Sequence, residues 1–72
     1  IEIYPSPAHD YFKLNQPSKK IVVYDLIGKV TQTFKGNFSS ESHFDVSNLK
    51  PGIYLVNIQS KRGTTTRKLL KY

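Results

Sequence analysis

Hydrophobic and polar residues alternate in short runs along this chain, and such a period of two is typical of half-buried β-strands. The clearest run covers residues 53–60, where Tyr54, Val56 and Ile58 fall on one face and more polar residues fall on the other. Residues 20–25 differ because they are β-branched and apolar on both faces. This second pattern predicts a central strand that is covered on both sides.

Seven runs of this kind follow one another at intervals of about 8 to 12 residues. They are residues 1–4, 10–15, 20–25, 30–34, 42–46, 53–60 and 64–72. No segment keeps a helical period. The spacing therefore predicts an all-β, antiparallel β-sandwich or barrel of about seven short strands.

Glycine and proline mark the turns between the runs. Pro51 followed by Gly52 predicts a type II turn with a positive φ at the glycine. Gly28 and Gly63 are each single and each stand at a predicted turn, and residues 53–60 and 64–71 are expected to pair across Arg62 and Gly63. Near the start, Pro5 and Pro7 make residues 5–8 an extended connector that is not helical.

The composition limits the size and the chemistry of the domain. A chain of 72 residues forms one domain, near the lower size limit for a single unaided core, and it has no room for a deep active-site cleft. It contains no cysteine, so packing without disulfides must stabilise it. The formal charge of +6 favours anionic partners, but lysines also protect the edges of small β domains from pairing with other chains. Both interpretations remain open.

The ends of the sequence indicate a piece of a longer polypeptide. The chain has no methionine, so Ile1 is not a natural start. No apolar run approaches the roughly 20 residues of a membrane-spanning helix, and no signal peptide opens the chain. We therefore expect residues 1–72 to be a single domain excised from a secreted precursor, without membrane insertion.

Residues that carry catalytic or metal chemistry do not converge in the sequence. His9 and His43 are isolated, whereas a metal site needs at least three converging ligands. There is no nucleophile elbow of the GxSxG type, and the glycines are too scattered for a phosphate-binding loop. We expect no enzymatic activity, no metal and no cofactor.

A nucleic-acid-binding barrel is a further possibility. Five tyrosines and four phenylalanines accompany eleven basic residues, which is the mixture used for base stacking and phosphate contact. However, most of the aromatic residues fall at positions that also fit core packing, among them Phe12, Phe44 and Tyr54. We therefore expect no nucleic-acid partner.

Four segments, taken together in this order, resemble a known family. They are "IYPSPAHD", "VVYDLIGKV", "FDVSNLKPGIYLVNI" and "GTTTRKLLKY". They are similar to the C-terminal sorting domain of cargo proteins of the type IX (Por) secretion system of Bacteroidetes, of the type A kind. The resemblance covers essentially the whole chain, and the order and spacing of the four segments are more specific than any one of them.

Individual positions match the family motifs. Tyr4-Pro5-Ser6-Pro7 corresponds to a Tyr-Pro-Asn-Pro motif, with a mild change of Asn to Ser. Tyr24-Asp25 and Gly28-Lys29 correspond to a family hairpin, and Gly52-Ile53-Tyr54 to its most recognisable stretch. Lys68, Leu69, Leu70 and Lys71 correspond to its basic and apolar end.

The resemblance implies an immunoglobulin-like β-sandwich that acts as an address label and has no catalytic activity. In the family, the label follows an N-terminal cargo domain and passes through the periplasm. The outer-membrane translocon recognises it, a sortase-like cysteine protease usually removes it, and the cargo reaches the cell surface or the medium. The alternative is an accessory β-sandwich that binds carbohydrate or stabilises an enzyme.

The resemblance also directs attention to the last run, residues 64–72. Strand alternation places Lys68 and Leu70 on one face and Leu69 and Lys71 on the other. The hypothesis from sequence is that Lys68 and Lys71 are exposed and contact the secretion machinery, while Leu69 or Leu70 holds the strand in place. Protection of an edge strand is the alternative explanation of the same cations.

Overall fold

A computed structural model describes residues 3–4 and 10–72 of the chain. These residues form seven strands and no helix. The strands are β1 (Ile3–Tyr4), β2 (Tyr11–Leu14), β3 (Ser18–Tyr24), β4 (Val30–Phe38), β5 (Phe44–Asp45), β6 (Gly52–Ser60) and β7 (Gly63–Lys71). The predicted all-β fold with about seven strands is confirmed.

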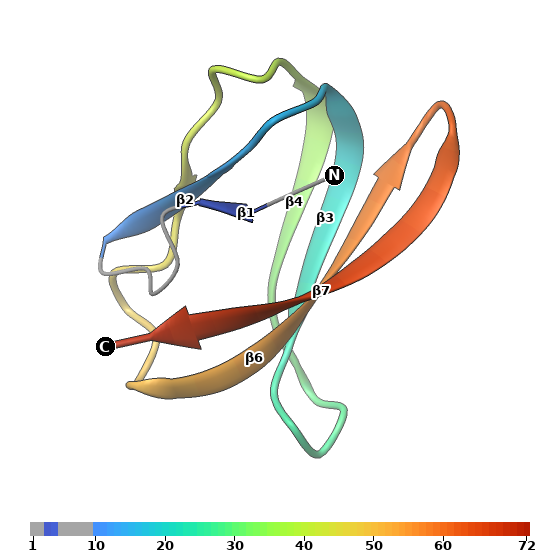
Figure 1. The fold of residues 1–72 in the computed structure, drawn as a ribbon. Coiled ribbons are helices and arrows are strands. Elements are labelled where there is room, and N and C mark those ends of the chain that lie inside the picture. The colour runs from blue at the N-terminus through green and yellow to red at the C-terminus, as the bar shows by residue number, and fades with distance from the viewer. Residues whose placement is uncertain (1–2, 5–9) are drawn as a thin grey trace.

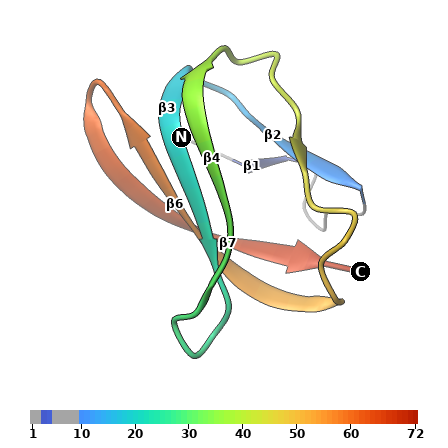
Figure 2. The same ribbon diagram turned by 180° about the vertical axis from the view of Figure 1, so that it is seen from behind.

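The strands form two antiparallel sheets, one ordered β1-β2-β5 and the other β4-β3-β6-β7. If the strands are labelled A, B, C, C′, E, F and G along the chain, these sheets are A-B-E and C′-C-F-G, which is an immunoglobulin-like arrangement. Figure 1 shows β1 and β2 on one side of the core and the ends of β6 and β7 on the other, and Figure 2 shows the same layers from behind.

The core lies between the two sheets and draws on five strands as well as on the segment after β5. Its fully buried members are aliphatic and aromatic side chains from both layers, including Phe12, Ile21, Phe44, Val56 and Leu69. Phe44 is the aromatic centre: its ring stacks on Phe12 at 5.1 Å and meets Phe34 and Phe38 edge-on. Edge-to-face aromatic pairs stabilise the folded state by more than the burial of their apolar area alone.

The alternation predicted for the clearest strands is confirmed. In β6, Tyr54, Val56 and Ile58 are buried. The run 20–25 also contains the central strand that was predicted, because β3 lies between β4 and β6 and its Ile21, Val22 and Val23 are all buried.

Strand β4 is longer than the sequence predicted. The predicted run ends at residue 34, but β4 continues to Phe38, and the Phe38 ring packs against Phe44 at 4.9 Å. The prediction was wrong because the extra length of β4 is stabilised by a contact across the core, and the polarity of the local sequence does not reveal that contact. Conversely, β5 covers only Phe44–Asp45 of the predicted 42–46, and His43 precedes it.

Two irregularities in the pairing of β3 with β4 change which side chains face inward. The register shifts between Ser18 and Lys20 and again between Val23 and Tyr24. The second shift places Val30 opposite Tyr24, whereas unbroken alternation from Gln32 would place Val30 on the other face. Such β-bulges insert one unpaired residue and redirect the side chains beyond it.

The turn at Gly52 differs from the predicted type. Its φ is positive, as expected, but the value of 155° is far from the about +80° that a type II turn requires. Gly52 is instead the first residue of β6 and pairs with Lys71. The β6–β7 hairpin also closes one residue earlier than expected, because Ser60 pairs with Gly63 and leaves Lys61 and Arg62 as its two loop residues.

Some predictions concern residues that the structure does not describe. Pro5 and Pro7 of the Tyr-Pro-Ser-Pro motif, and His9, lie outside the described ranges.

Candidate functional site

One half of the four-stranded sheet carries apolar side chains on the face turned away from the core. We call this face the outer face. Tyr24 pairs with both Leu55 and Val30, and Ile53 pairs with Leu70. Alternation with the buried residues of their strands places Tyr24, Ile53, Leu55 and Leu70 on the outer face, and the bulge in β4 brings Val30 to the same face opposite Tyr24. We define them as the apolar patch: Tyr24, Val30, Ile53, Leu55 and Leu70.

The apolar patch is accessible to a partner. Val30, Ile53 and Leu55 are 49%, 41% and 38% exposed, although an apolar side chain gains free energy when water is removed from it. Leu26 and Ile27, in the loop after β3, are more exposed still. In Figure 2 this loop projects from the end of β3 and β4. Contiguous exposed apolar residues of this kind commonly mark an interaction surface.

Cations border the apolar patch. Lys68 pairs with Leu55 and is exposed, and the exposed Lys29 directly precedes Val30. The nearby acidic group, Asp25, is engaged in its own turn: its Oδ1 accepts hydrogen bonds from the backbone N–H groups of Ile27 at 3.0 Å and Lys29 at 2.8 Å. The arrangement suits a partner with apolar side chains flanked by acidic ones.

The rest of the outer face is polar. Lys20 pairs with Lys35 on one side and with Gln59 on the other, and Gln59 pairs with Thr64. The outer face therefore changes from apolar to basic and polar along the strands, and only one end of it offers an apolar contact.

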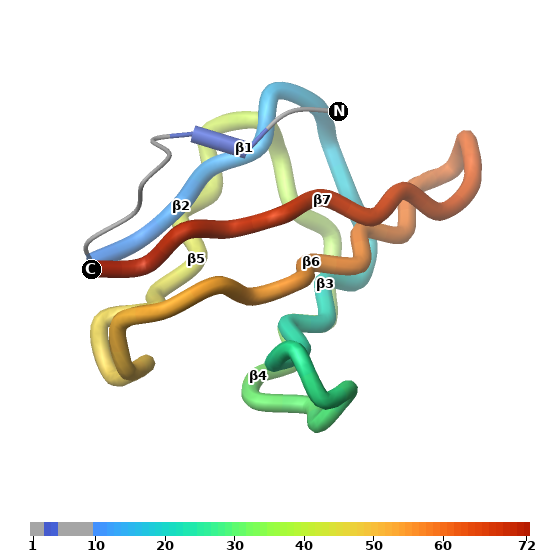
Figure 3. Tube along the Cα trace, turned by 60° about the horizontal axis from the view of Figure 1, so that its bottom comes forward, coloured from blue at the N-terminus to red at the C-terminus, as the bar shows by residue number. Residues whose placement is uncertain are grey.

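The structure places the four residues of the closing motif on two faces, as strand alternation in the sequence predicts. Lys68 and Leu70 lie on the outer face, whereas Leu69 is fully buried opposite Tyr54. Figure 3 shows β7 alongside β6, its antiparallel neighbour in the sheet. Within the closing motif, Leu69 therefore belongs to the core, and Lys68 and Leu70 belong to the accessible surface.

Lys71 corrects an expectation from sequence. It was expected to be exposed, but it is only 7% exposed and its Nζ donates a hydrogen bond to the Tyr72 backbone oxygen at 3.1 Å. Lys71 has the inward orientation of Leu69 and pairs with Gly52, a residue without a side chain. Its stem is therefore covered while its ammonium group reaches a carbonyl.

The other motif residues hold turns. Asp25 and Gly28 close the β3–β4 loop: the Gly28 N–H donates to the Asp25 carbonyl at 3.1 Å, and Gly28 has a φ of 88°. This is the left-handed region that glycine adopts without a steric penalty. Gly63 is the first residue of β7. Asp25 and Gly28 shape the loop beside the apolar patch, whereas Gly63 belongs to the β6–β7 turn at the other end of the sheet.

Tyr54 ties the segment before β6 to the strand itself. Its ring is buried, and its hydroxyl donates a hydrogen bond of 2.6 Å to the backbone oxygen of Lys50. A tyrosine near the start of this strand with a bond to the chain a few residues upstream is the tyrosine corner of immunoglobulin-like domains.

Tyr54→Phe should lower the free energy of unfolding by about 1 to 2 kcal/mol, because it leaves the Lys50 carbonyl without its buried donor. The corresponding shift in melting temperature is about 4 to 8 °C per kcal/mol for a domain of this size. Thermal unfolding followed by circular dichroism measures it. Tyr24→Phe is the matched control, since none of the residues that the structure describes accepts a hydrogen bond from the Tyr24 hydroxyl. Equal melting temperatures for the two variants would contradict this role of Tyr54.

The turn after β5 depends on a carboxylate. Asp45 Oδ1 accepts two hydrogen bonds from Ser47, one from its hydroxyl at 2.7 Å and one from its backbone N–H at 2.8 Å. Both bonds lower the pKa of Asp45, and the bond from the hydroxyl has the larger effect. A lowered pKa in the folded state stabilises the fold above the unfolded-state pKa. This contribution is lost as the pH falls through the folded-state pKa.

Neither metal chemistry nor a membrane span is evident in the described part of the chain. Residues 3–4 and 10–72 contain no group of three or more His, Cys, Asp or Glu side chains placed to hold a metal ion. His43 instead stacks on Tyr11, with ring centroids 4.3 Å apart. Among the same residues there is no helix that is long and apolar enough to span a membrane.

Comparison with known families identifies the kind of domain. The family model described as the secretion system C-terminal sorting domain matches residues 2–72. The chain belongs to this family. No curated protein and no solved structure matched the chain in the corresponding comparisons.

Membership of the sorting-domain family supplies the function. The domain is a C-terminal sorting signal for type IX secretion, so it interacts with that secretion machinery, is attached to a cargo protein and directs export toward the cell surface or the medium. Sorting domains of this family are not catalytic. The match does not favour the alternative of an accessory carbohydrate-binding or stabilising module.

Sequence reasoning missed most of the apolar patch. It singled out Lys68 and Leu70 but assigned no role to Val30, Ile53 or Leu55. A signal was present, since Leu55 is an apolar residue on the otherwise polar face of the run 53–60. Only the pairing of β6 with β3 and β7 brings Leu55 beside Tyr24 and Lys68.

Proposed function

We propose that the sorting domain is recognised through its apolar patch together with Lys68, and that the partner is the outer-membrane translocon of the type IX system. The observation that carries this proposal is the cluster of exposed apolar side chains on a folded sheet, bordered by cations. A folded surface presents these side chains in fixed positions, so the partner need not order them upon binding.

The remaining steps follow from the family and are part of the proposal. The domain ends its precursor and passes through the periplasm attached to an N-terminal cargo domain. A sortase-like cysteine protease then removes it at the surface. The domain itself catalyses nothing, needs no cofactor and binds no nucleic acid, and the type A motifs indicate a Bacteroidetes cargo protein.

The structure modifies the recognition hypothesis made from sequence. Lys68 and Leu70 stay in the proposed contact because they are on the outer face. Leu69 supports β7 from the core, and Lys71 is too buried to serve as a point of first contact. The proposed contact therefore uses alternate residues of β7 together with their neighbours on β6.

The test replaces Leu55 by threonine and Lys68 by glutamate in a full-length cargo protein. Threonine keeps a high β propensity, and exposed substitutions usually change stability by no more than about 0.5 kcal/mol. Export should fall about tenfold or more, because losing a central contact worth about 1.4 kcal/mol changes affinity by that factor. The measurement is the amount of cargo at the surface or in the medium, together with the melting temperature of the isolated domain.

The matched control is Lys35→Glu, which makes the same charge change at the polar end of the same face. Export by the control should stay close to that of the unchanged protein. Equal export by the double variant and the control, with similar melting temperatures, would show that the apolar patch is not the surface that is recognised.

A further inference from the structure

Strand β7 forms a long and regular edge of the four-stranded sheet. Among the described strands, β1 and β5 are the edges of one sheet, and β4 and β7 are the edges of the other. In the described residues β1 and β5 cover two residues each, and β4 carries an extra residue at both register shifts in its pairing with β3. Short edge strands and bulges both hinder the addition of another strand. β7 has neither feature, because it pairs with β6 over nine residues without a register shift.

Backbone groups of β7 point to this edge. Ser60 and Gly63 face each other across the two-residue turn of the β6–β7 hairpin, and residues in that position direct their N–H and C=O groups at each other. The direction of these groups alternates along a strand, so those of Thr64 and Thr66 point away from β6. In agreement, Arg67 Nη1 donates a hydrogen bond of 3.3 Å to the Thr66 backbone oxygen. An N–H group of an added strand can take the place of this guanidinium.

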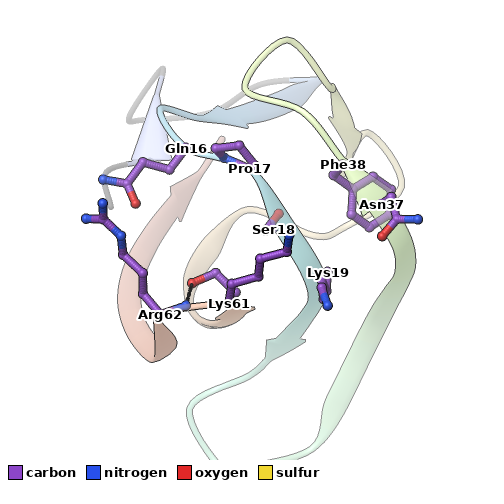
Figure 4. A pocket seen from close by; sticks show the side chains of 9 residues that line it. Gln16, Pro17, Ser18, Lys19, Asn37, Phe38, Lys61 and Arg62 are labelled. Carbon is purple, nitrogen blue, oxygen red and sulfur yellow. Dashed lines mark hydrogen bonds between the residues drawn. The ribbon is translucent and has the colours of Figure 1, made fainter.

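The turn end of the hairpin is accessible. Figures 1 and 3 show that it stands apart from the three-stranded sheet. Five of the six residues 63–68 are exposed, and a groove of about 230 Å³ beside the start of β7 is lined by Gln16, Ser60 and residues 62–65. Figure 4 shows the side chains of Gln16 and Arg62 next to each other at this end. A partner chain therefore has room to lie along the first half of β7.

The charges of the hairpin define the kind of chain that fits. β7 carries three cations, Arg67, Lys68 and Lys71, and no acidic residue, and β6 has no charged residue at all. Arg67 and Lys68 are exposed and lie on opposite faces of the strand. Carboxylates on an added strand therefore find an opposite charge on either face, and cross-strand pairs of opposite charge are stabilising.

A second copy of the domain fits this edge poorly. Antiparallel pairing of two β7 strands over their full length places Arg67 opposite the same residue of the other copy. Like charges directly opposite each other destabilise a pair of strands. The cations thus disfavour self-association and favour a different, acidic partner.

We propose that an extended acidic segment of the secretion machinery pairs with the edge of β7 and extends the four-stranded sheet by one strand. In such strand addition, main-chain hydrogen bonds supply affinity and side chains supply specificity. The inference rests on the interaction with the secretion machinery that family membership supplies. It adds a backbone contact at the edge of the sheet to the side-chain contact proposed for the apolar patch.

Two proline substitutions separate the edge from the fold. Thr66→Pro removes an N–H group that points to the open edge, where proline is tolerated, so the melting temperature should change little. Arg67→Pro is the matched variant at the next position. It removes an N–H group that points to β6 and should destabilise the domain strongly. A melting temperature of Thr66→Pro as low as that of Arg67→Pro would contradict the assigned direction of the backbone groups and overturn the proposal.

Binding is tested with a short, end-capped peptide of alternating glutamate and valine, and the control peptide has lysine in place of glutamate. Amide hydrogen exchange is followed by NMR. The glutamate peptide should slow exchange at Thr64 and Thr66 about tenfold when nine-tenths of the domain is bound, because only the free fraction exchanges. Thr65, whose N–H points to β6, should change much less. The absence of slowing, equal slowing by the lysine peptide, or undiminished slowing at Thr64 in Thr66→Pro would overturn the proposal.

Export of a full-length cargo protein tests the partner. Thr66→Pro should reduce export about tenfold, which corresponds to a lost contact of about 1.4 kcal/mol. Normal export by this variant would overturn the edge contact without affecting the apolar patch, whereas normal export by Leu55→Thr together with reduced export by Thr66→Pro would overturn only the apolar patch. Sedimentation of the isolated domain tests the other occupant: a dimer that is lost in Thr66→Pro would assign the edge to a second copy and overturn the acidic partner.

Discussion

Phe44→Ala should lower the free energy of unfolding by about 3 to 5 kcal/mol, as truncation of a buried phenylalanine usually does. Phe44 is 1% exposed, and its ring contacts three other aromatic rings, those of Phe12, Phe34 and Phe38. The small two-residue strand that carries it pairs only with β2 among the described strands. Removing the ring therefore removes the main contact of β5 with the rest of the core.

The effect is large relative to the total stability of so small a domain. At about 0.05 to 0.15 kcal/mol per residue, a chain of 72 residues has roughly 4 to 11 kcal/mol to lose. Urea unfolding followed by circular dichroism measures the change, and part of the population should be unfolded without urea. Phe44→Leu retains more apolar volume and should cost clearly less. An unchanged urea midpoint for Phe44→Ala would show that the aromatic cluster does not hold the two sheets together.

Leu69→Ala is the second change with a large expected effect, a loss of about 2 to 5 kcal/mol. Leu69 is fully buried and pairs with Tyr54, so alanine leaves a cavity between β7 and the opposite sheet. The adjacent Leu70 is the matched control, since it has the same side chain in the same strand but lies on the outer face. Leu70→Ala should change the melting temperature much less, because its side chain is only half-buried.

The two leucines also separate folding from recognition in an export assay. Leu69→Ala should reduce export in proportion to the loss of folded domain, and lowering the growth temperature should restore part of it. Leu70→Ala should reduce export while the domain stays folded, since Leu70 belongs to the apolar patch. Equal melting temperatures for the two variants would refute the division of the closing motif into a core half and a surface half.

The sequence by itself determined the class of fold and the two central strands of the four-stranded sheet. Alternation in residues 53–60 identified Tyr54, Val56 and Ile58 as inward-facing, and the two-sided apolar run 20–25 identified the central strand. Both are local patterns, because successive side chains of a strand point to opposite faces whatever the partner. The motifs also carried the family resemblance, which the match over residues 2–72 confirmed.

The composition of the surface depended on the tertiary structure. A bulge in β4 turned Val30 to the outer face, and this shift depends on pairing with β3. Lys71 became buried on the inward face of β7 that it shares with Leu69, and β4 extended to Phe38 through an aromatic contact across the core. Contacts between residues far apart in the chain decide each of these features, so neither periodicity nor residue type within one segment reveals them.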